Sequence, residues 1–235
     1  MNLILLLQED FITETCVRLQ GRRLKHVLEV HRANVGDELS VGMKNGLIGT
    51  GTVSRLDPSV LEMDVRLDRK PPAALPIALV LALPRPKVLR RVLRAATVMG
   101  VKRIFLINAY RVEKSYWLSP FLESGALGQQ LVLGLEQARD TVLPDVVLRP
   151  RFKPFVEDEL PAVIKETFPL VAHPAAGDPC PRNVTGPVTL AIGPEGGFIP
   201  YELEALAARG FKPVSCGERI LNVETAVPAL LSRLF

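Results

Sequence analysis

The chain has 235 residues, of which 48% are hydrophobic and 23% charged, with a formal net charge of +4. This apolar content excludes long disorder, and no apolar run is long enough to span a membrane. Cysteines 16, 180 and 216 form no C-x-x-C pattern, so we expect neither a disulfide framework nor a structural zinc site. We therefore expect a cytoplasmic location.

The first seventy residues are predicted to form mostly β-structure. The run at 3–7 meets Glu9 and Asp10 directly, so it indicates a first strand and not a signal peptide. Further strands are expected at 38–43, 47–56 and 60–67, with a hairpin turn at Asn45-Gly46. Leu24, Val27, Leu28 and His31 recur at helical spacing within a helix over 21–32. The pattern predicts a small barrel-like β domain over 1–70.

A proline-rich linker, Pro71-Pro72-Ala73-Ala74-Leu75-Pro76, precedes a different pattern. Strands and helices then alternate. Strands are expected at 77–83, 103–108, 145–149, 170–172, 188–192 and 211–215. Helices are expected at 86–99, 123–140, 155–167, 200–209 and 223–234. This alternation predicts an α/β domain over 77–235 with a largely parallel sheet.

The charge is unevenly distributed along the chain. Residues 1–75 are neutral, residues 76–154 carry thirteen basic and five acidic side chains, and residues 155–235 carry a net charge of −4. A concentrated positive segment attracts polyanions, above all nucleic acid. The alternative is a solvated basic surface.

Two groups of basic residues are candidates for RNA binding. The first lies on or beside the helix at 86–99 and comprises Arg85, Lys87, Arg90, Arg91 and Arg94. No acidic residue lies between Asp68 and Glu113, so these cations are uncompensated in the sequence, and phosphate contacts would explain them. The second lies on the helix at 21–32 and comprises Arg22, Arg23, Lys25, His26 and Arg32. His26 and His31 lack a well-placed carboxylate or thiol, so no metal site is expected.

Three loops follow predicted strands of the second domain. They are Gly193-Pro194-Glu195-Gly196-Gly197-Phe198, the stretch from Cys216 to Ala226, and the His173-Pro174 turn after the strand at 170–172. The first is neither a G-x-G-x-x-G fingerprint nor a P-loop. Loops at the carboxyl ends of parallel strands meet at one edge of a sheet, so these three could line one ligand cleft. Ordinary tight turns and a helix cap are the alternative.

The paired glycine loops resemble the signature of the SPOUT-class methyltransferases, and more narrowly the RsmE family, which methylates N3 of a uridine in 16S ribosomal RNA. The resemblance also covers His26-Val27-Leu28-Glu29-Val30-His31-Arg32, Val98-Met99-Gly100-Val101 and Glu136-Gln137-Ala138-Arg139. In that family Leu, Pro and Arg are usual where this chain has Cys216, Glu218 and Asn222.

The resemblance implies an N-terminal PUA-like RNA-binding barrel, a SPOUT α/β domain with a deep trefoil knot, and a homodimer. It implies S-adenosylmethionine as the cofactor and 16S rRNA or the 30S subunit as the partner, with no membrane and no metal. The implied cofactor-binding residues are Val171, Ala172, His173, Pro174, Gly193, Pro194, Glu195, Gly196, Gly197, Cys216, Gly217, Ile220, Leu221 and Thr225.

Methylation of N3 requires alignment with the methyl donor and loss of the N3 proton. Arg219 is the candidate cation that stabilises the uracil anion, and Glu195 and Glu224 are candidates for proton handling. Two alternatives stay open. One is an RNA-binding assembly factor with the same fold and lost or altered catalysis, which the departures at 218 and 222 would favour. The other is a SPOUT methyltransferase with a different RNA target.

Overall fold

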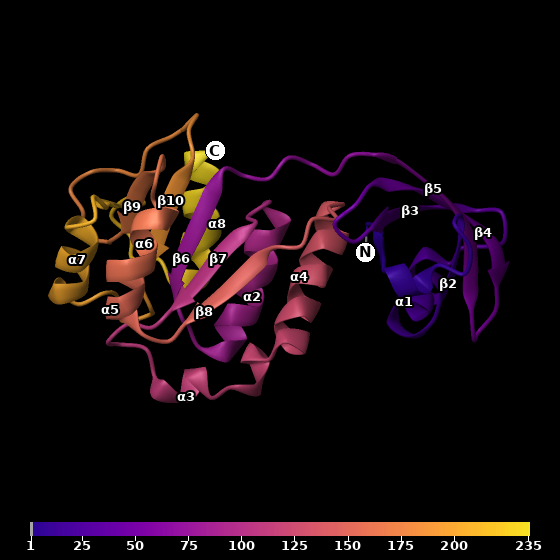
Figure 1. Ribbon diagram of the computed structural model, residues 1–235, viewed down its shortest axis with the longest axis horizontal. Helices are drawn as coiled ribbons and strands as arrows, with labels where there is room; N and C mark the ends of the chain where they lie inside the picture. Colours follow the sequence, from indigo (N-terminus) through magenta and orange to yellow (C-terminus); the bar gives the residue numbers. More distant parts are fainter. Residues whose placement is uncertain (1) are drawn as a thin grey trace. The chain divides into compact units, whose positions relative to one another are not determined.

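The computed structural model describes residues 2–235, except for the side chain of Ser124. The chain divides into two compact units (Figure 1). The first unit runs to Ala73 and also contains Val132–Leu143. The second unit comprises Ala74–Leu131 and Pro144–Phe235. Each unit is described by itself below.

A five-stranded sheet forms the first unit. Its order is β1-β3-β4-β5-β2, with β1 parallel to β3 and the other pairs antiparallel. The strands are β1 (Ile4–Leu6), β2 (Cys16–Leu19), β3 (Glu38–Met43), β4 (Ile48–Leu56) and β5 (Leu61–Arg69). The four predicted strands are confirmed, and Asn45 in the hairpin turn has φ +58°. Strand β2 was missed because four residues show too little periodicity.

The predicted helix at 21–32 is confirmed with a change of type. It consists of α1 (Gly21–His26) and a π-helical turn, η2 (Val27–His31), and a short 3-10 turn, η1 (Gln8–Asp10), precedes both. Leu24 and Val27 are buried against the sheet, whereas His31 is exposed. Arg32 ends the helix in the left-handed region at φ +52°.

The segment Val132–Leu143 completes the core of the first unit. It contains the second half of α4 (Ser124–Ala138), whose Leu135 is fully buried against Leu3, Leu5 and Ile48. The Thr141 hydroxyl donates to the Gly46 carbonyl at 2.6 Å, which fixes the segment to the β3–β4 turn. Nothing in the hydrophobic pattern indicated this association.

A six-stranded parallel sheet forms the second unit, in the order β11-β9-β10-β6-β7-β8. The strands are β6 (Ile77–Ala82), β7 (Arg103–Ile107), β8 (Asp145–Arg149), β9 (Phe168–Ala172), β10 (Val188–Ile192) and β11 (Lys212–Val214). Every residue of β6 and β10 is buried, as expected for strands covered on both faces. The prediction of an α/β unit with a parallel sheet is confirmed.

Helices cover both faces of this sheet, and α6 lies in front of it and α8 behind it in the view of Figure 1. The helical segments are α2 (Pro86–Val98), α3 (Lys114–Trp117), η3 (Pro120–Leu122), α5 (Phe152–Pro154), η4 (Phe155–Glu159), α6 (Leu160–Val163), α7 (Pro200–Ala207) and α8 (Val223–Leu234). The helix predicted at 155–167 instead spans α5 to α6, because its central turn is π-helical and it ends at Val163. Within the described residues, no helix has the length and apolarity to cross a bilayer.

Candidate functional site

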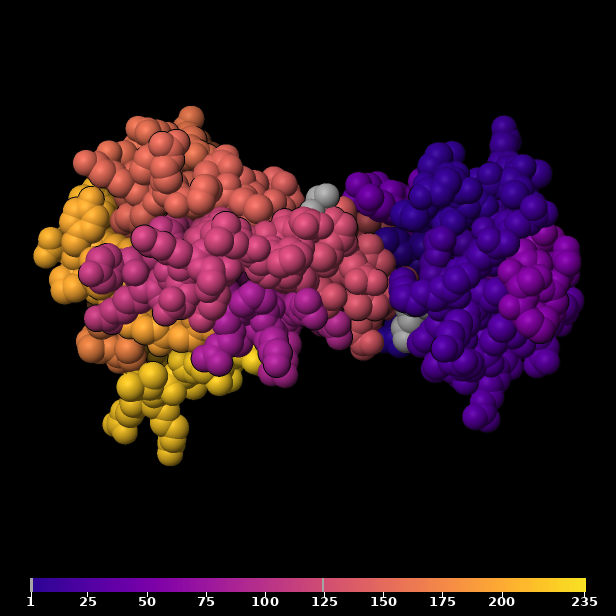
Figure 2. All heavy atoms as spheres, turned by 90° about the horizontal axis from the view of Figure 1, so that it is seen from below, coloured from indigo at the N-terminus to yellow at the C-terminus, as the bar shows by residue number. Residues whose placement is uncertain are grey.

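A cavity of about 720 Å³ opens at the carboxyl edge of the parallel sheet. Its walls are the loops that follow β9, β10 and β11, which are neighbouring strands. In the view of Figure 2, part of the C-terminal segment, drawn in yellow, is visible on the surface of the second unit. The volume is within the range of sites that bind small molecules and cofactors.

The structure brings together most of the residues predicted to bind a cofactor. All of them line this cavity except Val171, which is buried within β9, and Thr225. The backbone N–H of Thr225 donates to the Asn222 Oδ1 at 2.8 Å, so this residue belongs to the N-terminal cap of α8. Asn222 lies in the cavity wall and supplies that cap, which an arginine could not do.

Glycine is favoured at two positions of the loop after β10. A Cβ at position 193 would lie 3.0 Å from the backbone nitrogen of Phe198 and 3.2 Å from its ring. Gly197 has φ +73°, in the region that favours glycine. The loop therefore folds back on itself and leaves its backbone close to the cavity.

Two cysteines lie close to one another at or beside the cavity. Cys216 lines the cavity, and the backbone N–H of the buried Cys180 donates to the Ser215 carbonyl at 2.8 Å. Burial raises the pKa of the Cys216 thiol, and burial together with the neighbouring Cys216 raises that of Cys180 to about 11. Both thiols are therefore protonated at neutral pH, which argues against a nucleophilic thiolate here.

The two carboxylates predicted to handle protons are both in ion pairs with arginines of α2 or its N-terminus. Glu195 lines the cavity, and its Oε1 accepts from the Arg85 backbone N–H at 3.2 Å and from the Arg85 Nε at 3.4 Å. Glu224 lies outside the cavity wall, and its carboxylate accepts from Arg91 Nη1 at 3.1 Å. The expectation that the cations near α2 are uncompensated is therefore wrong for Arg85 and Arg91, because their acidic partners are remote in the sequence.

The other arginines of α2 contact uncharged side chains. The Arg90 guanidinium lies 4.8 Å from the centre of the Phe121 ring, and Arg94 Nη2 donates to the Gln130 Oε1 at 2.7 Å. Neither contact neutralises the charge of the arginine. The helix therefore retains positive charge for an anionic ligand.

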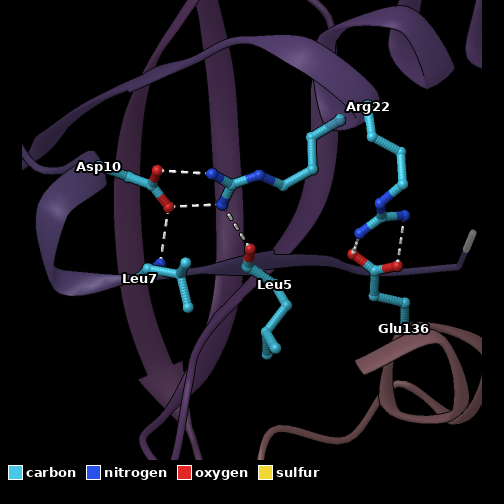
Figure 3. A network of polar contacts seen from close by, with 6 residues as sticks. Leu5, Leu7, Asp10, Arg22 and Glu136 are labelled. Atoms are coloured by element: carbon cyan, nitrogen blue, oxygen red, sulfur yellow. Dashed lines mark hydrogen bonds and ion pairs between the residues drawn. The ribbon is translucent and has the colours of Figure 1, made fainter. Parts of the chain in front are cut away.

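The basic group near the N-terminus has a different environment. Arg22 makes two bonds of 2.8 Å to the carboxylate of Glu136, and Arg23 bonds both Asp10 oxygens and the Leu5 carbonyl (Figure 3). The carboxylates of Asp10 and Glu136 are only 7% and 2% exposed. These arginines thus connect α1 to other segments of the first unit: Arg22 to the segment Val132–Leu143, and Arg23 to β1 and η1.

The histidines and the lysine of the same helix contact neighbouring side chains. The His26 and His31 rings meet edge to face with their centres 5.1 Å apart, and Lys25 forms an exposed pair with Glu29 at 3.8 Å. Across residues 2–235, no cluster of three or more His, Cys, Asp or Glu side chains could hold a metal ion.

Arg111 is a cavity residue that the sequence reasoning missed. It follows β7 and lines the cavity together with Arg219, the predicted catalytic cation. No motif surrounds it. The available signal was its position after a predicted parallel strand, at the same edge of the sheet as the three glycine and histidine loops.

The whole cavity lies in a segment that matches a known domain. Residues 71–235 match the profile of the RNA methyltransferase domain. The chain belongs to this RNA methyltransferase family. The first unit lies largely outside the matched segment, whereas every residue of the cavity wall lies inside this methyltransferase domain.

Full-length relatives of this methyltransferase carry one functional name. The chain is 29% identical to the ribosomal RNA small subunit methyltransferase E of Treponema pallidum, over 97% of this chain and 88% of that protein. It is 26% identical to the protein of the same name from Synechocystis, over 98% of this chain and 76% of that protein.

Solved structures share the fold of this methyltransferase. A ribosomal RNA small subunit methyltransferase E from Neisseria gonorrhoeae, described as bound to S-adenosyl methionine, has a TM-score of 0.77 and 19% identity, over 98% of this chain and 95% of that one. A putative methyltransferase from Legionella pneumophila, described in complex with the same cofactor, has a TM-score of 0.75 and 22% identity, with the same coverage. The likeness extends over both units.

Proposed function

We propose that this protein transfers a methyl group from S-adenosylmethionine to N3 of a uridine in the 16S RNA of the small ribosomal subunit. The observation that carries the proposal is the cavity that three loops share at the carboxyl edge of a parallel sheet, inside the matched RNA methyltransferase domain. Relatives aligned over nearly the whole chain are named small subunit rRNA methyltransferases, which supports the substrate.

The cavity fits the proposed cofactor. Its volume of about 720 Å³ suits a nucleoside with an amino-acid tail, and the loop after β10 offers backbone groups that a side chain at 193 would cover. The residues that would hold the cofactor are 172–174, 193–197, 216, 217, 220 and 221. When bound, S-adenosylmethionine supplies an activated methyl group, so the chain has to position its substrate and remove a proton.

The side chains at the cavity suit these remaining tasks. Arg219 lies in the wall, where a cation lowers the energy of the uracil anion that forms when N3 loses its proton. Glu195 and Glu224 remain the proposed proton acceptors. Glu195 lies in the cavity wall and pairs with Arg85, whereas Glu224 lies outside the wall and pairs with Arg91. N3 lies on the base-pairing edge, so the target uridine has to be unpaired or flipped out of its helix.

The finer architecture belongs to the same proposal. We infer that residues 1–70 form a PUA-like RNA-binding barrel, joined by the linker at 71–76 to a trefoil-knotted SPOUT domain at 77–235. The proposed RNA contacts are those of Lys87, Arg90, Arg91 and Arg94 on α2. The proposed location is the cytoplasm and the proposed assembly a homodimer. Sedimentation of the purified chain tests the assembly directly.

Methyl transfer from radiolabelled S-adenosylmethionine tests the function. Substrates are 30S subunits and naked 16S RNA from a strain lacking this gene, with the modified nucleotide mapped by mass spectrometry. We expect labelled 3-methyluridine in the RNA. The matched control is Gly197→Val, which forces a branched side chain into a backbone at φ +73° and should abolish cofactor binding. Absence of methyl transfer from the folded wild-type chain to any RNA form would refute the enzymatic proposal, and RNA binding without transfer would favour an assembly factor.

A further inference from the structure

The turn after β7 has two exposed side chains between two buried residues. Ala109 and Val112 are 2% and 7% exposed, and the Val112 N–H donates to the Ala109 carbonyl at 3.0 Å. Between them, Tyr110 and Arg111 are exposed, and Arg111 lines the cavity. Packing and this hydrogen bond therefore fix both ends of the turn, and with them the positions of the Tyr110 and Arg111 backbones.

Arg111 contacts the loop after β10, which we call the glycine loop (residues 193–198). Its Nη1 donates to the Gly196 carbonyl, and a Cβ at position 196 would be 2.9 Å from the Arg111 Cδ. The aliphatic part of the arginine thus occupies the space where a side chain at 196 would be. The guanidinium has five N–H donors in a planar fork, so the bond to Gly196 leaves donors that can bind oxygens of a ligand.

Glu202 connects the turn that carries Arg111 to the end of the loop after β10. It lies in the first turn of α7 and is 2% exposed, and its two carboxylate oxygens accept from the Tyr110 N–H at 2.7 Å and the Ile199 N–H at 3.0 Å. A buried carboxylate is costly unless it is hydrogen-bonded, and here both bonds join the two loops that meet at Arg111. Glu202 therefore links the residue before Arg111 to the end of the glycine loop.

The other arginine of the cavity is held less firmly. Both arginines are exposed, but within the described residues only Arg111 is hydrogen-bonded, to the Gly196 carbonyl. A charge that is already in position costs less to organise when the substrate binds. Of the two arginines, Arg111 has the better-defined position.

We propose that Arg111 binds a negatively charged oxygen of the target nucleotide at the edge of the cavity, and that Glu202 is the positioning residue that holds Arg111 there. This inference rests on the proposed function. The oxygen belongs either to a phosphodiester beside the target base or to the uracil ring as N3 loses its proton, and the same guanidinium chemistry suits both.

Kinetics of Arg111→Ala and Arg111→Lys provide the first test. Hydrogen bonds to charged groups predict a loss in kcat/KM for RNA of about ten- to a hundredfold for R111A, with partial recovery in R111K. Affinity for S-adenosylhomocysteine, measured by calorimetry, should change less than about twofold. Arg182→Ala is the matched control, because Arg182 is an exposed arginine of the same unit that lies outside the cavity wall. If R111A matches R182A in kcat/KM, the inference is overturned.

Two measurements distinguish the two sources of the oxygen. A phosphate contact predicts that R111A raises KM and lowers the salt dependence of RNA binding by about one unit of slope. A contact with the uracil anion predicts that R111A lowers kcat and shifts the pH profile of kcat to higher pH, with KM nearly unchanged. Either result supports the inference and assigns the contact.

A double-mutant cycle tests the role of Glu202. In Glu202→Gln the amide nitrogen faces one of the two backbone N–H groups, so one loop is released. We expect E202Q to lower kcat/KM about tenfold in the wild-type background and less than twofold in the R111A background, whereas the exposed Glu204→Gln changes neither. An equal loss in both backgrounds would show that Glu202 acts independently of Arg111, and would overturn its positioning role.

The outcomes also separate this inference from the proposed function. A folded wild-type chain that methylates no RNA refutes the function itself. A wild-type chain that is active, with R111A equally active, refutes only the role of Arg111.

Discussion

Two arginine clusters look alike in the sequence but differ in what they face. We call them the N-terminal cluster (Arg22, Arg23, Lys25, His26 and Arg32) and the α2 cluster (Arg85, Lys87, Arg90, Arg91 and Arg94). Arg22 and Arg23 pair with carboxylates that are 2% and 7% exposed. Arg85 and Arg91 pair with carboxylates that are 30% and 36% exposed. Exposure of the acidic partner, and not the density of cations, separates the two clusters.

This difference has a physical basis. An exposed ion pair contributes little to stability, so an RNA phosphate can replace the carboxylate at small cost. A buried carboxylate that loses its arginine is left uncompensated in a poor solvent for charge, which strongly destabilises the fold. The N-terminal cluster is therefore primarily structural, and the α2 cluster is the better RNA-binding surface.

Breaking the pair between Arg23 and Asp10 should have the largest effect. Arg23→Met leaves the Asp10 carboxylate with only the Leu7 N–H as a partner among the contacts described, and we expect the first unit to lose about 3 kcal/mol of unfolding free energy. Hydrogen exchange across 4–31 in increasing urea measures it. Asp10→Asn in the same chain should recover part of the loss, and Lys25→Met, in an exposed pair, is the control. A loss below about 1 kcal/mol would place Arg23 with the exposed pairs instead.

Neutralising the α2 cluster should affect RNA and not the fold. In Arg90→Ala/Arg91→Ala/Arg94→Ala we expect RNA affinity to fall at least about tenfold at moderate salt, and the slope of log K against log salt to decrease by about two to three. Filter binding across a salt series measures both, with Arg182→Ala as the control. The affinity for S-adenosylhomocysteine, measured by calorimetry, should be unchanged. If cofactor affinity falls equally, this helix face does not bind RNA.

Breaking the pair between Arg22 and Glu136 should have a smaller effect than breaking that of Arg23. The Arg22 side chain is 45% exposed, so solvent already screens the pair, and we expect Arg22→Met to lower the stability of the first unit by about 1–2 kcal/mol. Urea denaturation followed by exchange of the same peptides measures it. Adding Glu136→Gln should restore most of the stability, because it removes the unpaired charge. Failure to recover would mean that packing of the arginine chain, not its charge, is what matters.

A pH effect at His26 should be the smallest. Burial lowers the pKa of His26 below its ordinary value of 6.5. The unfolded chain then takes up the proton first as pH falls, so stability present above pH 6.5 is lost as pH falls towards the lowered pKa. Comparing the urea midpoint of the first unit at pH 7.5 and pH 5.5 tests this. His26→Gln should flatten the difference relative to wild type, and His173→Gln, in the second unit, should not.

The fold was predictable where an element depends on its own residues. Strands β3, β8 and β10 and helix α8 have the predicted bounds, because glycine, proline or asparagine residues lie close to their ends. The π-helical turns η2 and η4 were not predicted, since local spacing does not distinguish them from α-helix. The association of Val132–Leu143 with the first unit depends on contacts between residues far apart in the chain.

The cavity was predictable for a related reason. Loops after parallel strands meet at one edge, so knowing the strands located the loops, and glycines marked which of them come close to a ligand. The pairing of Arg85 with Glu195 and of Arg91 with Glu224 spans 110 and 133 residues, so no local pattern could reveal it. Arg111 was missed because it follows its strand without a glycine.

The assignment of Val132–Leu143 to the first unit has a consequence for biosynthesis. Arg22 and Glu136 are 114 residues apart, so at ordinary elongation rates roughly 6 to 23 s separate their synthesis on the ribosome. During that interval Leu3, Leu5 and Ile48 lack the cover of Leu135, and Arg22 lacks its carboxylate. The first unit is therefore incomplete when its five strands have been synthesised, and its apolar residues can bind chaperones until residue 143 has emerged.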